Sequence, residues 1–410
     1  MTEETTSCYD VVTSSSDNNA LREKYRNRTL INERYIFEKK IGMGSFGSVY
    51  RGRNIISNDG VAIKFEATTA KLPTLLWESK ILNHLSGTPG VVKLRYFGVE
   101  SNKNIIVMDL FSHNLAEEIK RLKTVVVVGS NCKTKIENTD SGSQEEIILD
   151  KDNINTETNI SSEPDKQAGM DVSTHTKSPD SSASDKGVNN RPNGLERPDG
   201  LERPDGLERP DGLDDYIKKL PPYTKEVIGY LIEMLQIISR VHDAGIVHRD
   251  IKPENFMICF PKSDSESKET DCKMLRIIDF GLSKFYKKGD KHVINTSDRS
   301  IVGTMRYIST HIHDGNVYSR RDDIISIMYV SIYLLKGTLP WCGMSPNKDD
   351  KLTKEQMVYN KKVQATLNEV CEGIPALFMK LLEYAYRLEY EEKPDYLYMI
   401  RQCKLLMRVL

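Results

Sequence analysis

Residues 129–212 separate two apolar parts of the chain, so a compact core must combine segments that lie far apart in the sequence. Ser, Asn, Asp, Thr, Lys and Glu dominate this stretch, and its end carries three tandem copies of LERPDG, at 195–200, 201–206 and 207–212. Each copy holds a Pro-Asp-Gly turn signal and one large apolar residue, so stacked copies would bury little surface. We therefore expect residues 129–212 to form a disordered insert.

The rest of the composition narrows the class of protein. Residues 1–30 are rich in Ser, Thr, Asn and Asp and are typical of a flexible arm. The formal net charge of −1 gives no general attraction to nucleic acid or to an anionic membrane, so we expect neither partner. Seven scattered cysteines without a CxxC pair indicate a reducing compartment. We expect a monomer in the cytoplasm or the nucleus.

The segment before the insert is typical of a small, mostly antiparallel lobe. The residues from Pro73 to Leu85 have the apolar spacing of a helix, and short runs around them have the pattern of strands. The predicted strands are Tyr35–Gly42, Ser48–Arg53, Gly60–Glu66, Val91–Val99 and Asn104–Leu110.

The segment after the insert is typical of a helical lobe. Apolar residues recur at helical spacing between Val227 and Val241, and further helices are predicted at Asp322–Lys336 and Ile374–Leu388. The predicted fold class is therefore α+β with two lobes. We place the small lobe and its link to the second at residues 31–111, and the larger helical lobe at 112–128 and 213–410, within one domain of residues 31–410.

A glycine-rich segment lies between the first two predicted strands. Gly42, Gly44 and Gly47 form a GxGxxG pattern, which occurs both in nucleotide-binding loops and in simple glycine-rich hairpins. Because a strand rather than a helix follows, the pattern disfavours a dinucleotide-binding fold. The candidate nucleotide-binding residues here are Ile41, Gly42, Met43, Gly44, Ser45, Phe46, Gly47, Val49 and Ala62.

Lys64 ends the strand-like run Val61-Ala62-Ile63, and Glu78 follows in the predicted helix. An ion pair between them would hold the ammonium against the phosphates of ATP. The alternative is an ordinary surface lysine at the end of an edge strand.

The most specific segment is His248-Arg249-Asp250-Ile251-Lys252-Pro253-Glu254-Asn255. It matches H-R-D-x-x-x-x-N, in which the Asp accepts the proton of the substrate hydroxyl and the Asn binds Mg²⁺. Asp279-Phe280-Gly281 follows a hydrophobic run and supplies a second metal-binding carboxylate. A surface loop at a helix end is the alternative for the octet alone.

These motifs occur in the order found in protein kinases, and the chain resembles that family. The resemblance implies ATP and Mg²⁺ as cofactors, Asp250, Lys252 and Asn255 as catalytic residues, and Asn255 and Asp279 as ligands of Mg²⁺. Lys252 together with Thr304 favours serine or threonine over tyrosine in protein substrates.

Within the kinases, the sequence is similar to the casein kinase 1 family. The usual A-P-E is missing, and Gly303-Thr304-Met305-Arg306-Tyr307-Ile308-Ser309 and Ser319-Arg320-Arg321-Asp322-Asp323 resemble that family's segments. The resemblance implies acidic or phosphate-primed substrates and an anion site made by Arg306, Lys361 and Lys362. It also implies that Met108 lies behind the adenine, and that Asp109, Leu110 and Phe111 form the hinge. Two departures, His311 and Met328, are expected to alter packing or substrate preference.

Three alternatives to a protein kinase alone fit the sequence less well. A kinase-like scaffold without activity would lack one of Lys64, Asp250, Asn255 and Asp279, and all four are present. A small-molecule kinase is disfavoured by the full set of protein-kinase motifs. The composition of residues 129–212 suits a segment that folds on binding a docking partner, which would be an added property.

Overall fold

The computed structural model describes residues 30–44, 47–70, 73–124, 213–259, 274–296, 301–346 and 352–410. The predicted arm, except for Leu30, and the predicted insert 129–212 lie outside these residues, as do Ser45 and Phe46. The model has a β-sheet region followed by a helical region, which confirms the predicted α+β class.

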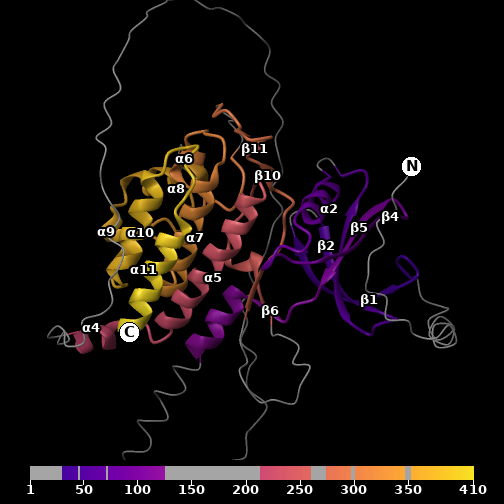
Figure 1. Ribbon diagram of the computed structural model, residues 1–410, viewed down its shortest axis with the longest axis horizontal. Coiled ribbons are helices and arrows are strands. Elements are labelled where there is room, and N and C mark those ends of the chain that lie inside the picture. Colours follow the sequence, from indigo (N-terminus) through magenta and orange to yellow (C-terminus); the bar gives the residue numbers. More distant parts are fainter. Residues whose placement is uncertain are drawn as a thin grey trace, which may run out of the picture. The chain divides into compact units, whose positions relative to one another are not determined.

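The small lobe is built on one antiparallel sheet with the strand order β1-β2-β3-β5-β4. Helix α2 (Leu75–His84) lies beside this sheet in Figure 1. The five strands are β1 (Tyr35–Gly44), β2 (Gly47–Asn54), β3 (Gly60–Ala67), β4 (Leu94–Glu100) and β5 (Lys103–Asp109).

Strand β4 begins later than its sequence predicts. Val91 forms a parallel bridge with Ile277, and the amide of Val92 donates to the carbonyl of Ile277. These residues therefore join the small lobe to a strand of the large lobe before β4 starts at Leu94. The sequence predicts that the apolar residues Val91 and Val92 belong to the strand of the small lobe. Their hydrogen-bonding partner is instead Ile277, which is distant in the sequence.

Alternation along β3 gives the sheet two different faces. Val61 and Ile63 belong to a small apolar cluster on one face, whereas Ala62 belongs to the main core. Lys64 shares the face of Ala62, because residues two apart in a strand point to the same side. This alternation directs the ammonium of Lys64 toward α2 and the large lobe.

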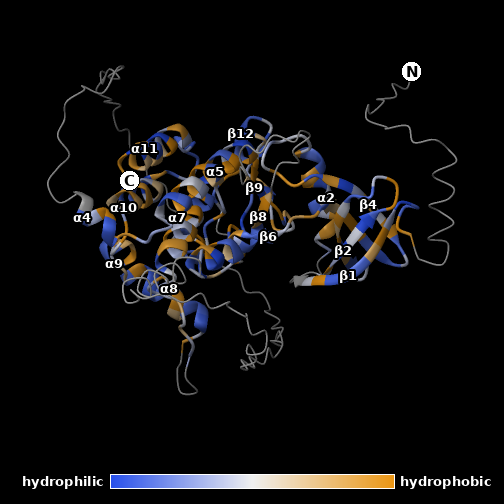
Figure 2. Ribbon diagram, turned by 90° about the horizontal axis from the view of Figure 1, so that it is seen from below, coloured by the Kyte–Doolittle hydropathy of each residue, from blue (hydrophilic) through white to orange (hydrophobic). Residues whose placement is uncertain are grey.

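The large lobe is mainly helical. Apolar and hydrophilic residues alternate along α5, α10 and α11 in Figure 2, as expected for helices that bury one face. Its longer helices are α5 (Thr224–Asp243), α7 (Arg320–Lys336), α8 (Lys354–Gln364), α10 (Ala376–Arg387) and α11 (Tyr396–Val409). Its shorter helices are α4 (Leu213–Lys219), α6 (Thr310–His313) and α9 (Leu367–Cys371).

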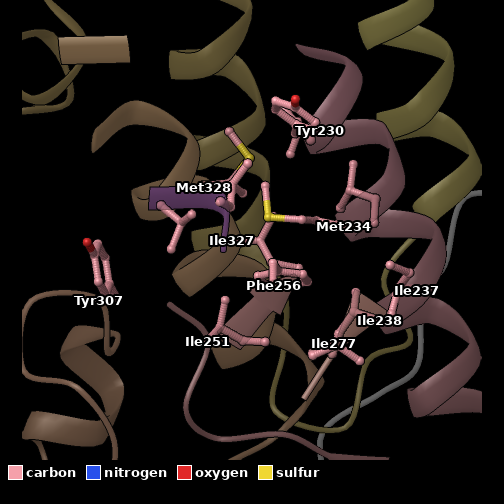
Figure 3. Packing of buried hydrophobic residues seen from close by; sticks show 14 of the residues in the cluster. Tyr230, Met234, Ile237, Ile238, Ile251, Phe256, Ile277, Tyr307, Ile327 and Met328 are labelled. Carbon is pink, nitrogen blue, oxygen red and sulfur yellow. The ribbon is translucent and has the colours of Figure 1, made fainter. Parts of the chain in front are cut away.

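The core of this lobe lies between α5 and α7. Met234 of α5 and Met328 of α7 are fully buried, and Figure 3 shows them with Ile327 and Phe256. Nearly all of α7 is buried, from Arg321 to Leu335 apart from Tyr333. Met328, one of the two departures from the family's sequence, thus contributes to the packing of the core. It does not line the pocket that contains the site residues.

Three short sheets organise the loops between α5 and α7. Strands β6 (His113–Asn114), β8 (Phe256–Cys259) and β9 (Met274–Ile277) form one sheet. Strand β7 (Ile246–Val247) pairs with β10 (Lys284–Phe285), and β11 (Lys287–Lys288) pairs with β12 (Lys291–His292). Across the described residues, no helix has the length and apolarity that a membrane crossing requires.

Two histidines of α6 make stability depend on pH. Burial lowers the pKa of His311 to about 4, with Arg321 acting in the same direction, and burial also lowers the pKa of His313 to about 4. Both rings then stay neutral in the folded chain at a pH where an unfolded histidine, with a pKa of 6.5, binds a proton. Because the unfolded state takes up more protons, stability should fall as the pH drops from 6.5 toward 4.

The measurement is the thermal midpoint at several pH values between 7 and 4.5. A variant with His311→Gln and His313→Gln should show a shallower decrease than the unmodified chain. An identical decrease in both proteins would assign the effect to other groups.

Candidate active site

A buried lysine joins two carboxylates from different lobes. Nζ of Lys64 lies 2.8 Å from Oε2 of Glu78 and 2.8 Å from Oδ1 of Asp279. Burial alone would lower the pKa of Lys64, but the two carboxylates outweigh it and raise the pKa above its ordinary value. Lys64 is therefore a permanent cation, and the predicted pair with Glu78 is formed.

Asp279 reaches this position through an unusual backbone. It has a φ of 64°, in the left-handed region that non-glycine residues rarely adopt. The preceding residue is fixed, since the amide of Ile278 donates to the carbonyl of Asn255. Burial would raise the pKa of Asp279, but the combined effects of Lys64, His248 and Lys252 outweigh it and the pKa is lowered. A strained residue held by its surroundings is typical of a functional site.

Asp250 is held by groups from two segments, its own and the one that contains Thr304. Its Oδ2 accepts from Nζ of Lys252 at 2.6 Å, and its Oδ1 accepts from Oγ1 of Thr304 at 2.7 Å. The side-chain amide of Asn255 donates to the Asp250 carbonyl at 2.8 Å. The structure therefore brings together all three predicted catalytic residues and Thr304.

A residue on α7 supports the loop that carries Asp250. The carboxylate of Asp323 accepts from the backbone amides of His248, at 2.7 Å, and Arg249, at 2.9 Å. Nε2 of His242 lies 3.0 Å from the same carboxylate. Arg249 has a φ of 74°, so these contacts hold another residue in the left-handed region. In the sequence, Asp323 stands out only as part of a segment that resembles the casein kinase 1 family, and no pattern singles out His242.

One pocket contains most of the predicted nucleotide-binding residues. Met257 and Ile278 also line it, although the sequence analysis did not select them. Ile278 directly precedes Asp279, and Met257 follows Asn255 by two residues. Their apolar character next to these motif residues is the sequence signal that could have identified them. The predicted residues that line the pocket are Ile41, Val49, Ala62, Lys64, Glu78, Met108, Asp109, Leu110, Asn255 and Asp279.

The three glycines of the glycine-rich segment lie at the end of β1 and at the start of β2. Gly44 pairs with Gly47 and Gly42 pairs with Val49, and the backbone of Met43 pairs with Ser48. A Cβ atom at Gly47 would lie 1.9 Å from the carbonyl oxygen of Phe65 on β3, so a side chain cannot be accommodated there without movement. Gly47 therefore allows β2 to lie close to β3 at this point.

The three predicted anion-site residues have different surroundings. Nζ of Lys362 is buried and donates to the carbonyls of Met305 and Ile308, at 2.7 and 2.6 Å. Burial lowers the pKa of Lys362 to about 7. Lys361 pairs with Glu369 at 2.8 Å, and the guanidinium of Arg306 lies 4.9 Å from the ring centre of Tyr333. Lys362 thus supports the segment that carries Arg306, and this geometry disfavours direct contact between Lys362 and an anion.

Comparison with known proteins agrees with this geometry. The model of the protein kinase domain matches residues 35–139 and 207–394. The chain belongs to the protein kinase family. Residues 140–206, which separate the two matched parts, lie inside the insert predicted from the sequence.

A curated relative narrows this assignment. The chain is 28% identical over 368 residues to Casein kinase I homolog 3 of Schizosaccharomyces pombe. This alignment covers 89% of the present chain and 60% of the relative, so the chain spans about three fifths of that protein's length. The resemblance to the casein kinase 1 family is thereby confirmed.

Proposed function

We propose that this chain transfers the γ-phosphate of ATP to serine or threonine residues of protein substrates. The observation that carries the proposal is the geometry of Asp250, whose carboxylate is fixed by Lys252 and Thr304 beside the pocket that contains Lys64 and Asp279. In a protein kinase the corresponding Asp accepts the proton of the attacking hydroxyl.

Each polar group around Asp250 has a separate task. Thr304 and Lys252 fix both carboxylate oxygens, so Asp250 can orient a substrate hydroxyl without first losing side-chain freedom. The ammonium of Lys252 also places a positive charge where a transferring phosphoryl group carries negative charge. Lys64 brings a second positive charge to the pocket.

The residues of the pocket fit ATP with Mg²⁺. Carboxylate and amide oxygens are ligands that Mg²⁺ prefers, and Asp279 and Asn255 offer one of each. The amide nitrogen of Asn255 is taken by Asp250, which leaves its oxygen for the metal. Bound Mg²⁺ would neutralise charge on the phosphates, while Met108, Leu110 and Met257 provide an apolar surface for the base.

Transfer of radiolabelled phosphate from ATP to casein, with Mg²⁺ present, tests the proposal. Incorporation by the unmodified chain that is lost in Asp250→Asn would support it. No incorporation by a folded chain that still binds ATP would contradict it and favour a scaffold role.

We further propose that the substrates are acidic or carry a priming phosphate. Arg306 supports this proposal, because no carboxylate among the described residues pairs with its guanidinium in an ion pair. Tyr307 and Tyr333 flank the guanidinium instead, which keeps it oriented. Arg binds phosphate oxygens through its planar fork of donors.

Arg306→Ala should raise the KM for a peptide with a phosphoserine three residues before the target serine by about tenfold. The KM for the unprimed peptide should change little, because that peptide offers no phosphate at this position. Arg387→Ala is a matched control, since Arg387 is exposed, lies outside the predicted anion site and pairs with Glu383 on α10. Equal changes for both peptides would remove Arg306 from a primed-substrate site.

We also propose residence in the cytoplasm or nucleus, and docking of protein partners through residues 129–212. The basis is the cysteine usage of the chain and the polar composition of that stretch. Fluorescence microscopy and affinity capture with the full chain and with a chain lacking 129–212 test both points. Unchanged location and unchanged binding partners would exclude a docking role for these residues.

A further inference from the structure

One face of α2 contacts the large lobe through two aromatic side chains. Trp77 and His84 are seven residues apart, which is close to two helical turns, so they lie on the same face. Nε1 of Trp77 donates to the carbonyl of Ser283 at 2.7 Å, and Nε2 of His84 lies 3.0 Å from the carbonyl of Ala244. A carbonyl oxygen only accepts, so Nε2 of His84 carries the proton in this contact.

The ring of Phe285 contacts both aromatic groups. Its centre lies 6.2 Å from that of Trp77 and 5.1 Å from that of His84, with interplanar angles of 85° and 83°. Edge-to-face packing of this kind fixes the orientation of the rings as well as their distance. Phe285 therefore meets α2 at two points, one near each end of the helix.

Phe285 is itself fixed to the loop that leads into the catalytic segment. Strand β10 pairs with β7, with Phe285 opposite Ile246 and Lys284 opposite Val247. His248 follows β7 directly. Ala244, the partner of His84, precedes β7 by two residues. The contacts of α2 thus converge on the two strands that flank the catalytic segment and Asp279.

These contacts lie next to the ion pairs of the active site. Trp77 directly precedes Glu78, and Ser283 follows Asp279 by four residues. Glu78 and Asp279 both bind Lys64 at 2.8 Å. A displacement of α2 of about 1 Å would lengthen the pair between Glu78 and Lys64, and errors of that size can cost two orders of magnitude in rate.

The exposure of the rings separates this contact from ordinary core packing. Trp77 is 36% exposed and Phe285 is 39% exposed, although both are large and apolar. Both side chains therefore bury less apolar surface than core residues do. Their contacts instead fix the position of α2 against β7 and β10.

We propose that Trp77, His84 and Phe285 form a clamp that positions α2, and with it Glu78 and Lys64, for phosphoryl transfer. This proposal rests on the proposed kinase function. The three are positioning residues, because they act on the reaction through Glu78 and Lys64. The clamp consists only of unmodified side chains of this chain, so it assembles the ion pairs without a phosphorylated residue.

The test compares Trp77→Ala and Phe285→Ala with Leu76→Ala. Leu76 is a matched control, because it lies on the same helix and is 43% exposed. The clamp variants should lower kcat on the order of 10- to 100-fold, while the KM for a peptide substrate and the thermal midpoint stay close to those of Leu76→Ala. Amide hydrogen exchange in residues 75–84 should be faster in both clamp variants than in the control.

Two further variants complete the design. Trp77→Phe keeps a ring but removes the donor to Ser283, so kcat and amide exchange should lie between those of the unmodified chain and Trp77→Ala. The kcat of the double variant, with Trp77→Ala and Phe285→Ala, should be little lower than that of either single variant. Each single change already removes the contact between Trp77 and Phe285. If Trp77→Ala does not fold, Trp77→Phe and Phe285→Leu take its place.

Exchange in residues 75–84 that is equal in Trp77→Ala, Phe285→Ala and Leu76→Ala would overturn the clamp. The exchange measurement does not depend on catalysis. A chain that transfers no phosphate would therefore refute the proposed function, whereas the exchange rates would still decide whether the clamp exists.

Discussion

Asp250→Asn is expected to lower kcat by about 10²- to 10⁴-fold, the usual contribution of a general base. An amide cannot take the proton of the substrate hydroxyl, although it occupies the same space. Asp250 makes no contact with Lys64 or Glu78 among the recorded interactions of the described residues, so the affinity for ATP should change little. Steady-state kinetics with casein and a fluorescent nucleotide-binding assay give the two quantities.

The control for this change is Asp243→Asn. Asp243 pairs with Lys393 at 2.8 Å, and both side chains are more than half exposed, so the pair contributes little to stability. The control should keep the kcat of the unmodified chain. A tenfold change in kcat corresponds to about 1.4 kcal/mol in the activation free energy. If the kcat of Asp250→Asn is within threefold of the kcat of the control, Asp250 is not the general base.

Asp323→Ala is expected to destabilise the fold by about 3–5 kcal/mol, the cost of breaking a buried charged network. The change leaves the amides of His248 and Arg249 without their acceptor and removes one of the two partners of His242, which keeps its contact with the hydroxyl of Tyr396. Unpaired donors in the interior are costly, because water cannot replace the lost partner. Denaturant unfolding, followed by tryptophan fluorescence, measures the loss.

A second Asp→Ala change calibrates the result. Asp395 is exposed and caps α11, where its carboxylate accepts from the amide of Tyr398 at 2.8 Å. Loss of a helix cap costs about 1 kcal/mol. Equal losses in Asp395→Ala and Asp323→Ala would show that the buried carboxylate is not the main support of the catalytic segment.

The strands, the main helices and the order of the site residues could be predicted because each depends on a local pattern. Alternation in β3 already places Lys64 on the face opposite Val61 and Ile63, and the helical spacing before His248 identifies α5. The motif from His248 to Asn255 identifies Asp250 because its spacing is specific. In these cases the residues that act together are also close together in the sequence.

The supporting contacts could not be predicted from local patterns. Asp323 binds the amide of His248 across 75 positions of sequence, and Trp77 binds Ser283 across 206. The adjacent residues Lys361 and Lys362 look alike in the sequence, yet one pairs with Glu369 near the surface and the other is buried. Burial of a charged side chain depends on which carbonyls the fold brings to it.

The separation of the active-site partners also has a consequence during translation. Lys64 and Asp279 are 215 positions apart, so a ribosome that adds about 5–20 residues per second needs roughly 10–40 s to deliver the second partner after the first. Through that interval the small lobe has its sheet but lacks its neighbour, and Leu75, Ile81 and Leu82 of α2 belong to a core that is not yet complete. The apolar face of this helix therefore stays uncovered until the segment containing Asp279 has left the exit tunnel, and transiently exposed apolar surface of this kind is what makes nascent chains prone to aggregate.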